Sequence, residues 1–423
     1  MNNSAMTAGT RTVSSREELL DAAGAPEVAQ IQVAGTVSEL PSFRLAPGQQ
    51  LRGGPQGGML RFAPGEDGIE VSSGNTVADL TLTTDPDRRA LFNDTRVAGL
   101  GRTELSRLAI TGNVRLLLRG EARSGHLEAH DIQIAAADAR GFGERPSGFG
   151  VEVVPGVFTI WNLQEDPDSL ITADLSGLTA GQRGLPVRGS GIFVGGTPRG
   201  GRLLVRTLET NEIHADGGIS EGTPDRISGG VFVVHGAWVD RVHNAGAVTT
   251  YGPNDMVLDN WGTVERWHAD EKITSYGASG IGFVNFGTIG VLRVDGAIET
   301  FGRGARGFNV YAGTVRDAEF ERIITRADGA VGVQISQPIG RLAVRRGIET
   351  HGGIGSSLVK GVITQLPATA LSIKPGGSVR EIAISGGLLA HGENIEPIEM
   401  HGIVESFQVS GGFRPEGGGF SRI

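Results

Sequence analysis

The sequence contains no cysteine, which excludes disulfide bonds, thiolate metal sites and cysteine nucleophiles. It also lacks any run of about 18 apolar residues, the length that a helix needs to span a bilayer. Basic residues are outnumbered, at 38 against 47 acidic residues, and no basic cluster stands out along the chain. The net charge of -9 argues against a polyanion as the main ligand. We therefore expect neither a nucleic acid nor a membrane as partner.

Glycine is the residue that the sequence has in excess, at 68 of 423 positions. Short apolar runs such as "IQVAGTV", "GIEVSS" and "LTLTT" lie between turns of Gly, Asn, Asp and Pro. After Gly24 no segment has a convincing helical pattern. The pattern predicts an all-β protein with short strands, arranged as a sandwich, a propeller or a solenoid.

An internal repeat decides among these three arrangements. "VTTYG", "ITSYG" and "IETFG" begin at Val248, Ile273 and Ile298, at equal intervals, and further matches begin at Ile324 and Ile348. The period of about 25 residues is too short for a propeller blade, which needs about 40, but suits one coil of three short strands, which needs roughly 20 to 30. The repeat therefore predicts a solenoid of stacked coils, spaced about 4.8 Å apart around an apolar interior.

The repeat, together with a short helix that precedes "IQVAGTV", resembles the right-handed parallel β-helix proteins of the pectate-lyase-like superfamily, from about Val13 to Gly412. The resemblance implies a single-stranded right-handed parallel β-helix with coils of about 25 residues, whose N-terminal helix covers the open end of the stack. The sequence has no Asp-Asp pair, no polygalacturonase-like "NTD" and no Arg-x-Pro-x-x-Arg as in pectate lyases. The resemblance therefore extends to the fold and carries no activity with it.

The expected domain boundaries follow from the same pattern. Residues 1–12 are expected to form a flexible lead. Ser14 and Ser15, each three residues before a glutamate, form two overlapping capping boxes that open the capping helix, placed within residues 13–26. The β-helix with its loop insertions is expected over residues 27–412, followed by a C-terminal tail at residues 413–423.

Aromatic side chains are predicted to form two outward columns, because strand residues alternate between the two faces. Aligning the coils gives one column of Asp216, Tyr251, Tyr276, Phe301, His351 and His391, and a second of His235, Trp261, Phe286, Tyr311 and His401. Such rings could stack to stiffen the solenoid, or they could form a platform for sugar rings. The predicted substrate-binding residues are Tyr251, Trp261, Tyr276, Phe301, Tyr311, His243, Asp216 and Arg303.

A cluster of ionisable side chains is predicted on a third strand. "WHAD" turns His268 and Asp270 outward, and one coil later "LRVD" turns Arg293 and Asp295 outward in the same columns, with Glu299 around the next corner. Carboxyl groups that share a site can cleave a glycosidic bond, one as a protonated acid and one as a base or nucleophile. The predicted catalytic residues are Asp270, Asp295, Glu299, His268 and Arg293. A lattice of surface ion pairs is the alternative interpretation.

Two functions are consistent with these features. The first is a carbohydrate-active enzyme, a glycoside hydrolase, lyase or transferase, that acts on an oligo- or polysaccharide at the outer wall. The second is a non-catalytic β-helix, such as an adhesin or a phage-tail-like protein. No cofactor and no metal are predicted, a homotrimer is possible, and the first residues predict a cytoplasmic protein unless an export signal was removed. If the predicted carboxylates are inactive, the loops at 162–170 and 217–230 are the next location, with Asp166, Asp168 and Asp216.

Overall fold

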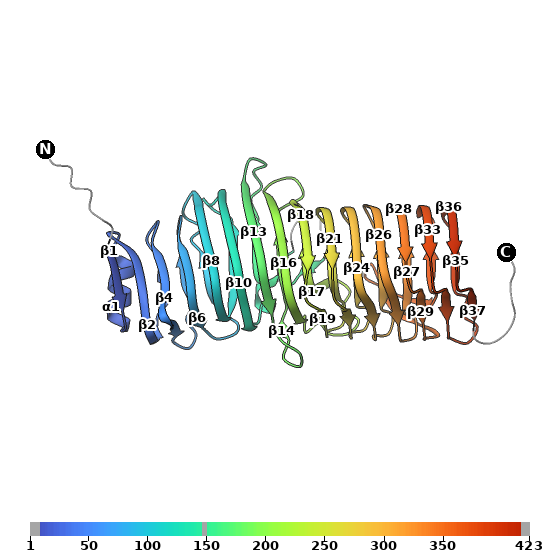
Figure 1. Cartoon of the computed structure of the whole chain (residues 1–423), viewed down its shortest axis with the longest axis horizontal. Helices are drawn as coiled ribbons and strands as arrows, with labels where there is room; N and C mark the ends of the chain where they lie inside the picture. The colour runs from blue at the N-terminus through green and yellow to red at the C-terminus, as the bar shows by residue number, and fades with distance from the viewer. Residues whose placement is uncertain (1–8, 146–149, 416–423) are drawn as a thin grey trace.

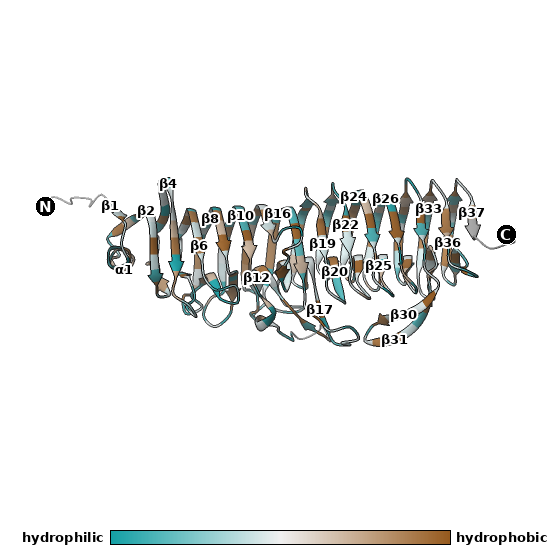
Figure 2. Cartoon of the chain, turned by 90° about the horizontal axis from the view of Figure 1, so that it is seen from below, coloured by the Kyte–Doolittle hydropathy of each residue, from teal (hydrophilic) through white to brown (hydrophobic). Residues whose placement is uncertain are grey.

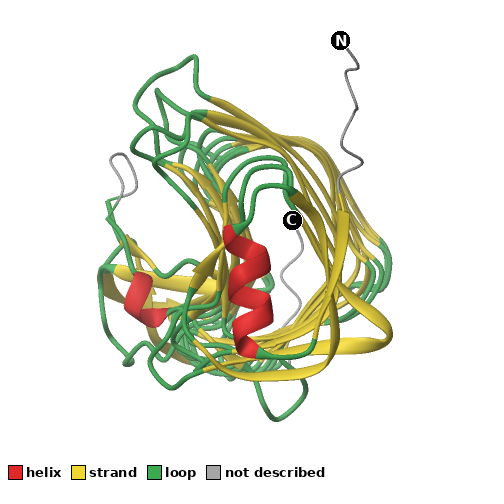
Figure 3. Ribbon diagram, turned by 90° about the vertical axis from the view of Figure 1, so that its left-hand side faces the viewer, coloured by secondary structure: helices red, strands yellow, loops and turns green. Residues whose placement is uncertain are grey.

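The computed structural model describes residues 9–145 and 150–415, and its strands stack in parallel along one long axis (Figure 1). Within these residues, two long sheets run the length of the stack, one of 21 strands and one of 14 strands, which we call the large sheet and the small sheet. Seen along the axis, the strands surround a common core (Figure 3). The prediction of an all-β protein of stacked parallel strands is therefore confirmed.

The large sheet forms most of the wall. Its strands are β1 (Gly9–Val13), β2 (Val28–Leu40), β4 (Gln50–Phe62), β6 (Thr76–Thr83), β8 (Gly99–Thr111), β10 (Ser124–Ala136), β13 (Leu170–Ala180), β14 (Val187–Arg188), β16 (Arg202–Asp216), β18 (Ala237–Asn244), β19 (Val248–Thr250), β21 (Thr263–Ala269), β22 (Ile273–Ser275), β24 (Thr288–Thr300), β26 (Thr314–Thr325), β28 (Pro338–Val344), β29 (Ile348–Thr350), β33 (Ser378–Ile384), β34 (Leu388–Ala390), β36 (Ile403–Val409) and β37 (Phe413–Pro415).

The small sheet closes the remaining side of each coil. Its strands are β3 (Phe43–Arg44), β5 (Ile69–Val71), β7 (Arg89–Asn93), β9 (Asn113–Leu118), β11 (Glu152–Val153), β12 (Gly156–Asn162), β15 (Ser190–Gly195), β17 (Arg226–Val233), β20 (Asp255–Asn260), β23 (Ile281–Asn285), β25 (Arg306–Val310), β27 (Val331–Ile335), β32 (Leu371–Ile373) and β35 (Ile398–Met400). A separate antiparallel hairpin consists of β30 (Ile354–Val359) and β31 (Val362–Pro367).

The pairing of the strands gives the spacing of successive coils in the middle of the stack. Ile273 pairs with both Val248 and Ile298, which lie equally far from it along the chain. The next inward residue is Ile323, which pairs with Ile298 and with Ile348. The sequence alignment placed Ile324 in this column, and that assignment is wrong by one position. Ile324 pairs instead with Glu299 on the outward face, and the two adjacent isoleucines made the register ambiguous in the sequence.

Several strands are longer than the sequence predicted. β24 has 13 residues and pairs with both β21 and β22, so one continuous strand covers two faces that the previous coil covers with two short strands. A register shift between Val294 and Ala297 marks the bend at which β24 passes from one face to the next. Local bulges of this kind bend a strand while pairing continues on both sides.

The core consists of apolar columns that run from coil to coil. Val264, Ile289, Val315, Ile339 and Val379 pair in succession and are all buried. Trp267 also lies in the core, where its ring contacts Phe283 at 4.9 Å between centroids and its indole N–H donates to the side-chain oxygen of Asn244 at 2.8 Å. Trp267 therefore packs in the interior and not on the surface.

The two ends of the chain differ in detail from the expected boundaries. The helix α1 (Arg16–Gly24) has Ser15 as its N-cap, and Ser15 and Glu18 form a capping box. α1 buries Leu19, Ala22 and Ala23 and lies across the N-terminal end of the stack (Figure 3). Residues 9–13, most of them placed in the expected lead, form β1, and residues 413–415, expected in the tail, form β37. The rest of the expected lead and tail, residues 1–8 and 416–423, lies outside the described residues.

A second, smaller apolar cluster lies on the outer face of the small sheet. It contains Trp161, Phe193, Phe232, Met256 and Val284, with Val153 of the short strand β11 packed against them. The hairpin of β30 and β31 projects from one side of the stack (Figure 2) and adds Val359 to the same cluster. Loops therefore cover part of the outer wall here, and they create the hollows described below. Within residues 9–145 and 150–415 no helix has the length and hydropathy needed to cross a bilayer.

Candidate functional site

The first predicted aromatic column is present at a corner of the stack. Tyr276 stacks on Tyr251 at 5.4 Å between ring centroids and on Phe301 at 4.9 Å. The side of this column is accessible, since Tyr276 is 48 % exposed. Asp216, predicted in the same column, forms an ion pair with Arg188. The stacked rings end at Phe301, because Arg326 occupies the next position before the stacked pair of His351 and His391.

The second predicted column is also present, and it continues from surface to interior. Trp261 stacks on Phe286 at 4.1 Å, and Phe286 stacks on Tyr311 at 5.3 Å. Tyr311 points outward from the solenoid, yet it is only 7 % exposed. The ammonium group of Lys360, in the turn between β30 and β31, lies 5.4 Å from its ring centre. The hairpin therefore covers this end of the column, which the sequence repeat could not show.

Trp261 separates two hollows on the outer wall. The first is an open groove of about 770 Å³ at the corner where the small sheet meets the large sheet. Its lining includes Trp261 and Trp238, and Trp238 is 46 % exposed. The polar side chains along it are those of Asp168, Thr197, Arg199, Arg202, His235, Thr263 and Thr288. The loop at 162–170 contributes Asp168, so one of the alternative positions predicted from the sequence lines a groove.

The second hollow lies between the small sheet and its covering loops. Its volume is about 420 Å³, and it is lined largely by apolar side chains, including those of Ile281, Phe286, Tyr311 and Leu358. Two carboxyl groups, Asp225 and Asp259, also line it. Asp225 is on the loop at 217–230, while Asp259 comes from β20 at the floor.

The two carboxyl groups of this cavity have opposite electrostatic surroundings. Burial raises the pKa of Asp259 well above the usual range, and an interaction with the side chain of Trp261 offsets this only in part. Among residues 9–145 and 150–415, neither carboxyl oxygen of Asp259 has a hydrogen-bond partner with ordinary geometry. At the rim, a hydrogen bond from the guanidinium of Arg145 lowers the pKa of Asp225. The surroundings therefore favour the neutral form of the acid at the floor of the cavity and the ionised form of the carboxyl at its rim.

Other buried polar groups lie close to the cavity. Arg306 is fully buried, and one of its terminal nitrogens donates to the hydroxyl of Ser357 at 2.9 Å. Its remaining nitrogens, and both side-chain atoms of Asn309, have no hydrogen-bond partner among the described residues. Asp255 is a different case, because its carboxylate accepts hydrogen bonds from the backbone N–H groups of Gly217 and Gly252. Burial nevertheless raises the pKa of Asp255 to about 7.

The predicted catalytic cluster lies on the large sheet as a network of ion pairs. Asp295 accepts hydrogen bonds from Arg293 and Arg345, and His268 Nε2 lies 2.8 Å from its carboxylate. Burial raises the pKa of Asp295, but these hydrogen bonds outweigh burial and hold the pKa well below its usual range. These surroundings favour the ionised form of Asp295 and so oppose its use as the protonated acid of the predicted mechanism.

Glu299, around the corner, has the same kind of surroundings. Its carboxylate is paired with Lys272 and with Arg326, whose Nη2 lies 2.7 Å away. Burial raises the pKa of Glu299, and the hydrogen bonds from Lys272 and Arg326 lower it further than burial raises it. Of the three carboxyl groups proposed as acid, Asp295 and Glu299 thus have their pKa shifted in the direction opposite to that role.

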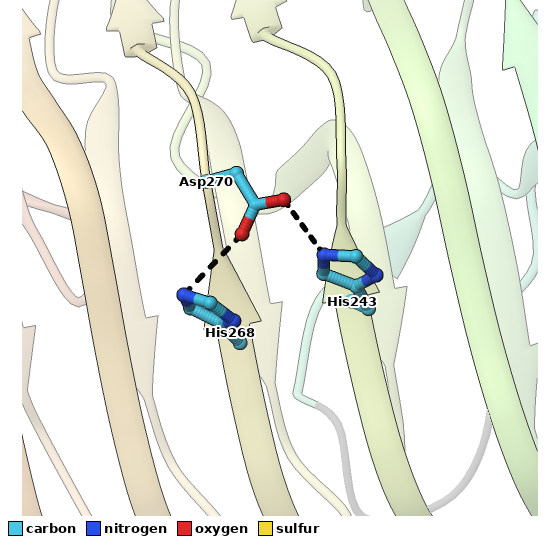
Figure 4. A group of neighbouring side chains, drawn as sticks. All are labelled: His243, His268 and Asp270. Atoms are coloured by element: carbon cyan, nitrogen blue, oxygen red, sulfur yellow. Dashed lines mark hydrogen bonds and ion pairs between the residues drawn. The ribbon is translucent and has the colours of Figure 1, made fainter.

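Asp270 differs from both of these residues because it lies between two imidazoles (Figure 4). Its oxygens are 2.9 Å from His243 Nε2 and 3.3 Å from His268 Nε2. The two imidazole rings are nearly parallel, at 5.6 Å between centroids. The structure thus brings together His243, His268, Asp270, Arg293 and Asp295 in one connected group on the outer wall.

Several residues of these sites were not found in the sequence. Asp259 lies in "MVLDNW", where nothing in the letters distinguishes a buried carboxyl from an exposed one. Lys360 and Asp225 reach the cavity on insertions, which obey no repeat. Glu209, which lies 3.3 Å from His243, and Arg345, which contacts Asp295, also belong to the charged group. Both could have been found by extending the charged columns one or two coils in each direction. Arg303, predicted to bind substrate, is paired at the surface with Glu221.

Neither the protein-family models, nor the curated proteins, nor the solved structures contain a match to this chain.

Proposed function

We propose that this protein recognises a carbohydrate, an oligo- or polysaccharide, in the hollows on either side of Trp261. The observation that carries this proposal is the position of Trp261, whose indole lines both the open groove and the adjoining cavity. Sugar rings pack their C–H faces on aromatic side chains, while nearby polar groups take the hydroxyls. The groove offers both kinds of group side by side.

The composition of the groove suits a hydroxylated ligand. Trp238 supplies a second accessible aromatic surface, and Asp168, Arg199 and His235 supply donors and acceptors along the same groove. Burial lowers the pKa of His235, which favours the neutral imidazole at pH 7, and its ring also forms a hydrogen bond with the backbone of Trp261. A mixture of one acidic and several basic groups favours a neutral or acidic sugar.

A second candidate function is cleavage of the bound carbohydrate. The observation that favours it is the pair Asp225 and Asp259, whose pKa values are shifted in opposite directions at one cavity. Such a difference assigns one carboxyl as proton donor and the other as base or nucleophile. Asp259 lies beneath the aromatic wall, so a movement of Trp261 would have to precede proton transfer. The cluster of Asp270, Asp295 and Glu299 remains the alternative location for the chemistry.

A glycan array on the intact protein, followed by product analysis of every glycan that binds, tests both functions. We expect binding that Trp238→Ala weakens. If products appear, Asp259→Asn and Asp225→Asn should abolish them, whereas Asp270→Asn should have little effect. An array without any bound glycan would refute carbohydrate recognition. Binding without products would leave recognition standing and refute cleavage.

We further propose that the solenoid is right-handed, with coils of about 25 residues, and that α1 closes its N-terminal end. The evenly spaced pairing of Val248, Ile273, Ile298 and Ile323 supports the coil length. The burial of Leu19, Ala22 and Ala23 against the first strands supports the role of the helix. Right-handed crossovers are strongly preferred where parallel strands are connected. A crystal structure would test all three statements.

A further inference from the structure

Asp270 differs from other carboxylates on the same wall in the cations that surround it. On the same wall, Asp174 is paired with Arg206, Asp317 with Arg341, and Asp295 with Arg293 and Arg345. Within the part of the chain that the structure describes, the ion pairs of Asp270 are with His243 and His268 alone. A histidine supplies a positive charge only when it holds two protons, so Asp270 has no permanent cation beside it.

His243 lies between two carboxylates. Its Nε2 faces Asp270 at 2.9 Å, and its Nδ1 lies 3.3 Å from a carboxylate oxygen of Glu209, one coil earlier. A neutral imidazole has one N–H and one lone pair, so it cannot donate to both carboxylates at once. This contradiction disappears if the Nε2 lone pair binds a cation, while Nδ1–H donates to Glu209. Ligating histidines in metalloproteins commonly donate their second N–H to a carboxylate in this way.

We propose that His243, His268 and Asp270 form a site for a divalent transition-metal ion of the zinc type, with Glu209 orienting His243. The donor atoms of the three residues all lie within 4.8 Å of one another. A tetrahedral zinc ion with bonds of about 2.0–2.2 Å holds its ligand atoms about 3.3–3.6 Å apart, so small side-chain movements complete the geometry. Each imidazole binds the ion through the lone pair of Nε2 and keeps its one proton on Nδ1, so a neutral ligand releases no proton on binding. A water molecule takes the fourth position.

The composition of the site selects the class of metal. Two imidazole nitrogens and one carboxylate suit zinc and its neighbours in the first transition series. Magnesium and calcium prefer sites made entirely of oxygen ligands. The strands β18 and β21 hold the two imidazoles in paired positions, His243 opposite His268, so the spacing of the ligands is built into the sheet (Figure 4).

Two similar clusters on the same molecule serve as comparisons. In the cluster of Glu349, His351 and His391, the carboxylate already pairs with Arg322, and the guanidinium of Arg326 lies 3.1 Å from His351 Nε2. In the cluster of His126, Glu128 and Asp174, Arg102 pairs with Glu128 and Arg206 with Asp174. Fixed cations beside these carboxylates oppose a second cation, so we expect neither cluster to bind metal.

The proposal is tested by isothermal titration calorimetry with zinc chloride. The protein used is the full chain, free of any affinity tag and stripped of metal with a chelator. We expect one zinc ion per chain at this site. His268→Ala should weaken binding by more than the roughly 10- to 100-fold that loss of an outer hydrogen-bond partner causes, and Glu209→Gln should weaken it by about tenfold. The matched control, His391→Ala, should leave the affinity unchanged, and magnesium chloride should give no binding.

Circular dichroism and melting of each metal-free variant would establish that the variants fold. If His268→Ala does not fold, Asp270→Asn, whose side chain is 41 % exposed, replaces it. Absence of zinc binding by the wild type would overturn the proposal. Equal loss of binding in His391→Ala, or unchanged binding in a folded His268→Ala, would overturn it as well. None of these outcomes depends on carbohydrate binding, so this proposal can fail while the proposed function stands.

Discussion

The indole of Trp261 stacks on the ring of Phe286 with 4.1 Å between centroids and an angle of 20° between their planes. Trp261 lines both hollows, and this contact packs it against the next coil. Trp261 therefore contributes to stability as well as to the proposed site. Trp238 offers the cleaner test of carbohydrate binding, since nearly half of its surface is exposed.

Replacing Trp238 with alanine should lower the affinity for a bound glycan about 2- to 13-fold, because one aromatic stacking contact contributes about 0.5–1.5 kcal/mol. The melting temperature should barely change. Titration of wild type and variant with the strongest glycan of the array gives the comparison. Tyr276→Ala, at the exposed corner column, is the matched control and should keep the affinity. The reverse result, with only Tyr276→Ala weakened, would place the ligand on the corner column.

Replacing Asp259 with asparagine should stabilise the protein at alkaline pH. The pKa of Asp259 is raised in the folded state, so the folded protein keeps a proton that the unfolded chain releases above about pH 4. The free energy of unfolding of the wild type therefore falls as the pH rises above about 4. Asparagine has no such proton, so the melting temperature of the variant should match wild type near pH 4 and exceed it at pH 8.

Asp255 supplies a comparison for this experiment, because burial raises its pKa to about 7. The backbone N–H groups of Gly217 and Gly252 both donate to one of its oxygens, Oδ2, and the side-chain oxygen of asparagine can replace that oxygen. The melting temperature of Asp255→Asn should therefore rise relative to wild type between about pH 4 and pH 7 and rise no further above pH 7. If wild type and Asp259→Asn melted at the same temperature throughout, the carboxyl of Asp259 would have to be ionised in the folded protein.

Replacing Asp295 with asparagine should lower stability at neutral pH, by about 1 kcal/mol after allowance for its partial exposure. Its pKa is depressed in the folded state, so its contribution is present above about pH 4 and is lost as the pH falls further. The difference between variant and wild type in urea unfolding should therefore shrink towards pH 3. In an Arg345→Gln background the same replacement should cost less, because the shared hydrogen bond is already gone. Equal costs in both backgrounds would contradict this account.

Removing the hairpin should abolish ligand binding in the cavity while the stack still folds. β27 pairs directly with β32 across the insertion, so Val333 and Leu371 are neighbours in the sheet although the hairpin lies between them in the chain. Replacing residues 354–367 with a short glycine linker removes Leu358 and Lys360 from the cavity wall. The circular dichroism spectrum of this variant should still show the strand signal of the wild type. Loss of the cooperative melting transition would show that the hairpin is needed for the stack itself.

The sequence was sufficient to predict the stacked parallel strands, because the interior repeats its apolar residues with Gly at fixed turns. It also identified the residues of both aromatic columns, since neighbouring coils place equivalent side chains one above another. It misassigned Ile324, because "IIT" offers two apolar residues where only Ile323 points inward. It could not foresee that Tyr311 is buried, because the covering hairpin is an insertion outside the repeat.

The charges of the predicted catalytic cluster were placed correctly next to one another, but their ionisation was not predictable from one strand. Arg345 reaches Asp295 from two coils further along the chain. Arg326 similarly reaches Glu299 from the next coil. The pKa of a surface carboxylate in a solenoid depends on side chains from several coils, and no single repeat contains them.

The direct pairing of β27 with β32 has an evolutionary consequence. A loop can enter or leave the turn between two coils in a single genetic event, since the strands on either side keep their partners. The stem would then persist through a lineage while the lining of the cavity changes from one descendant to the next. Selection for a new ligand could thus act on the hairpin alone, without altering the register of the coils that holds the molecule together.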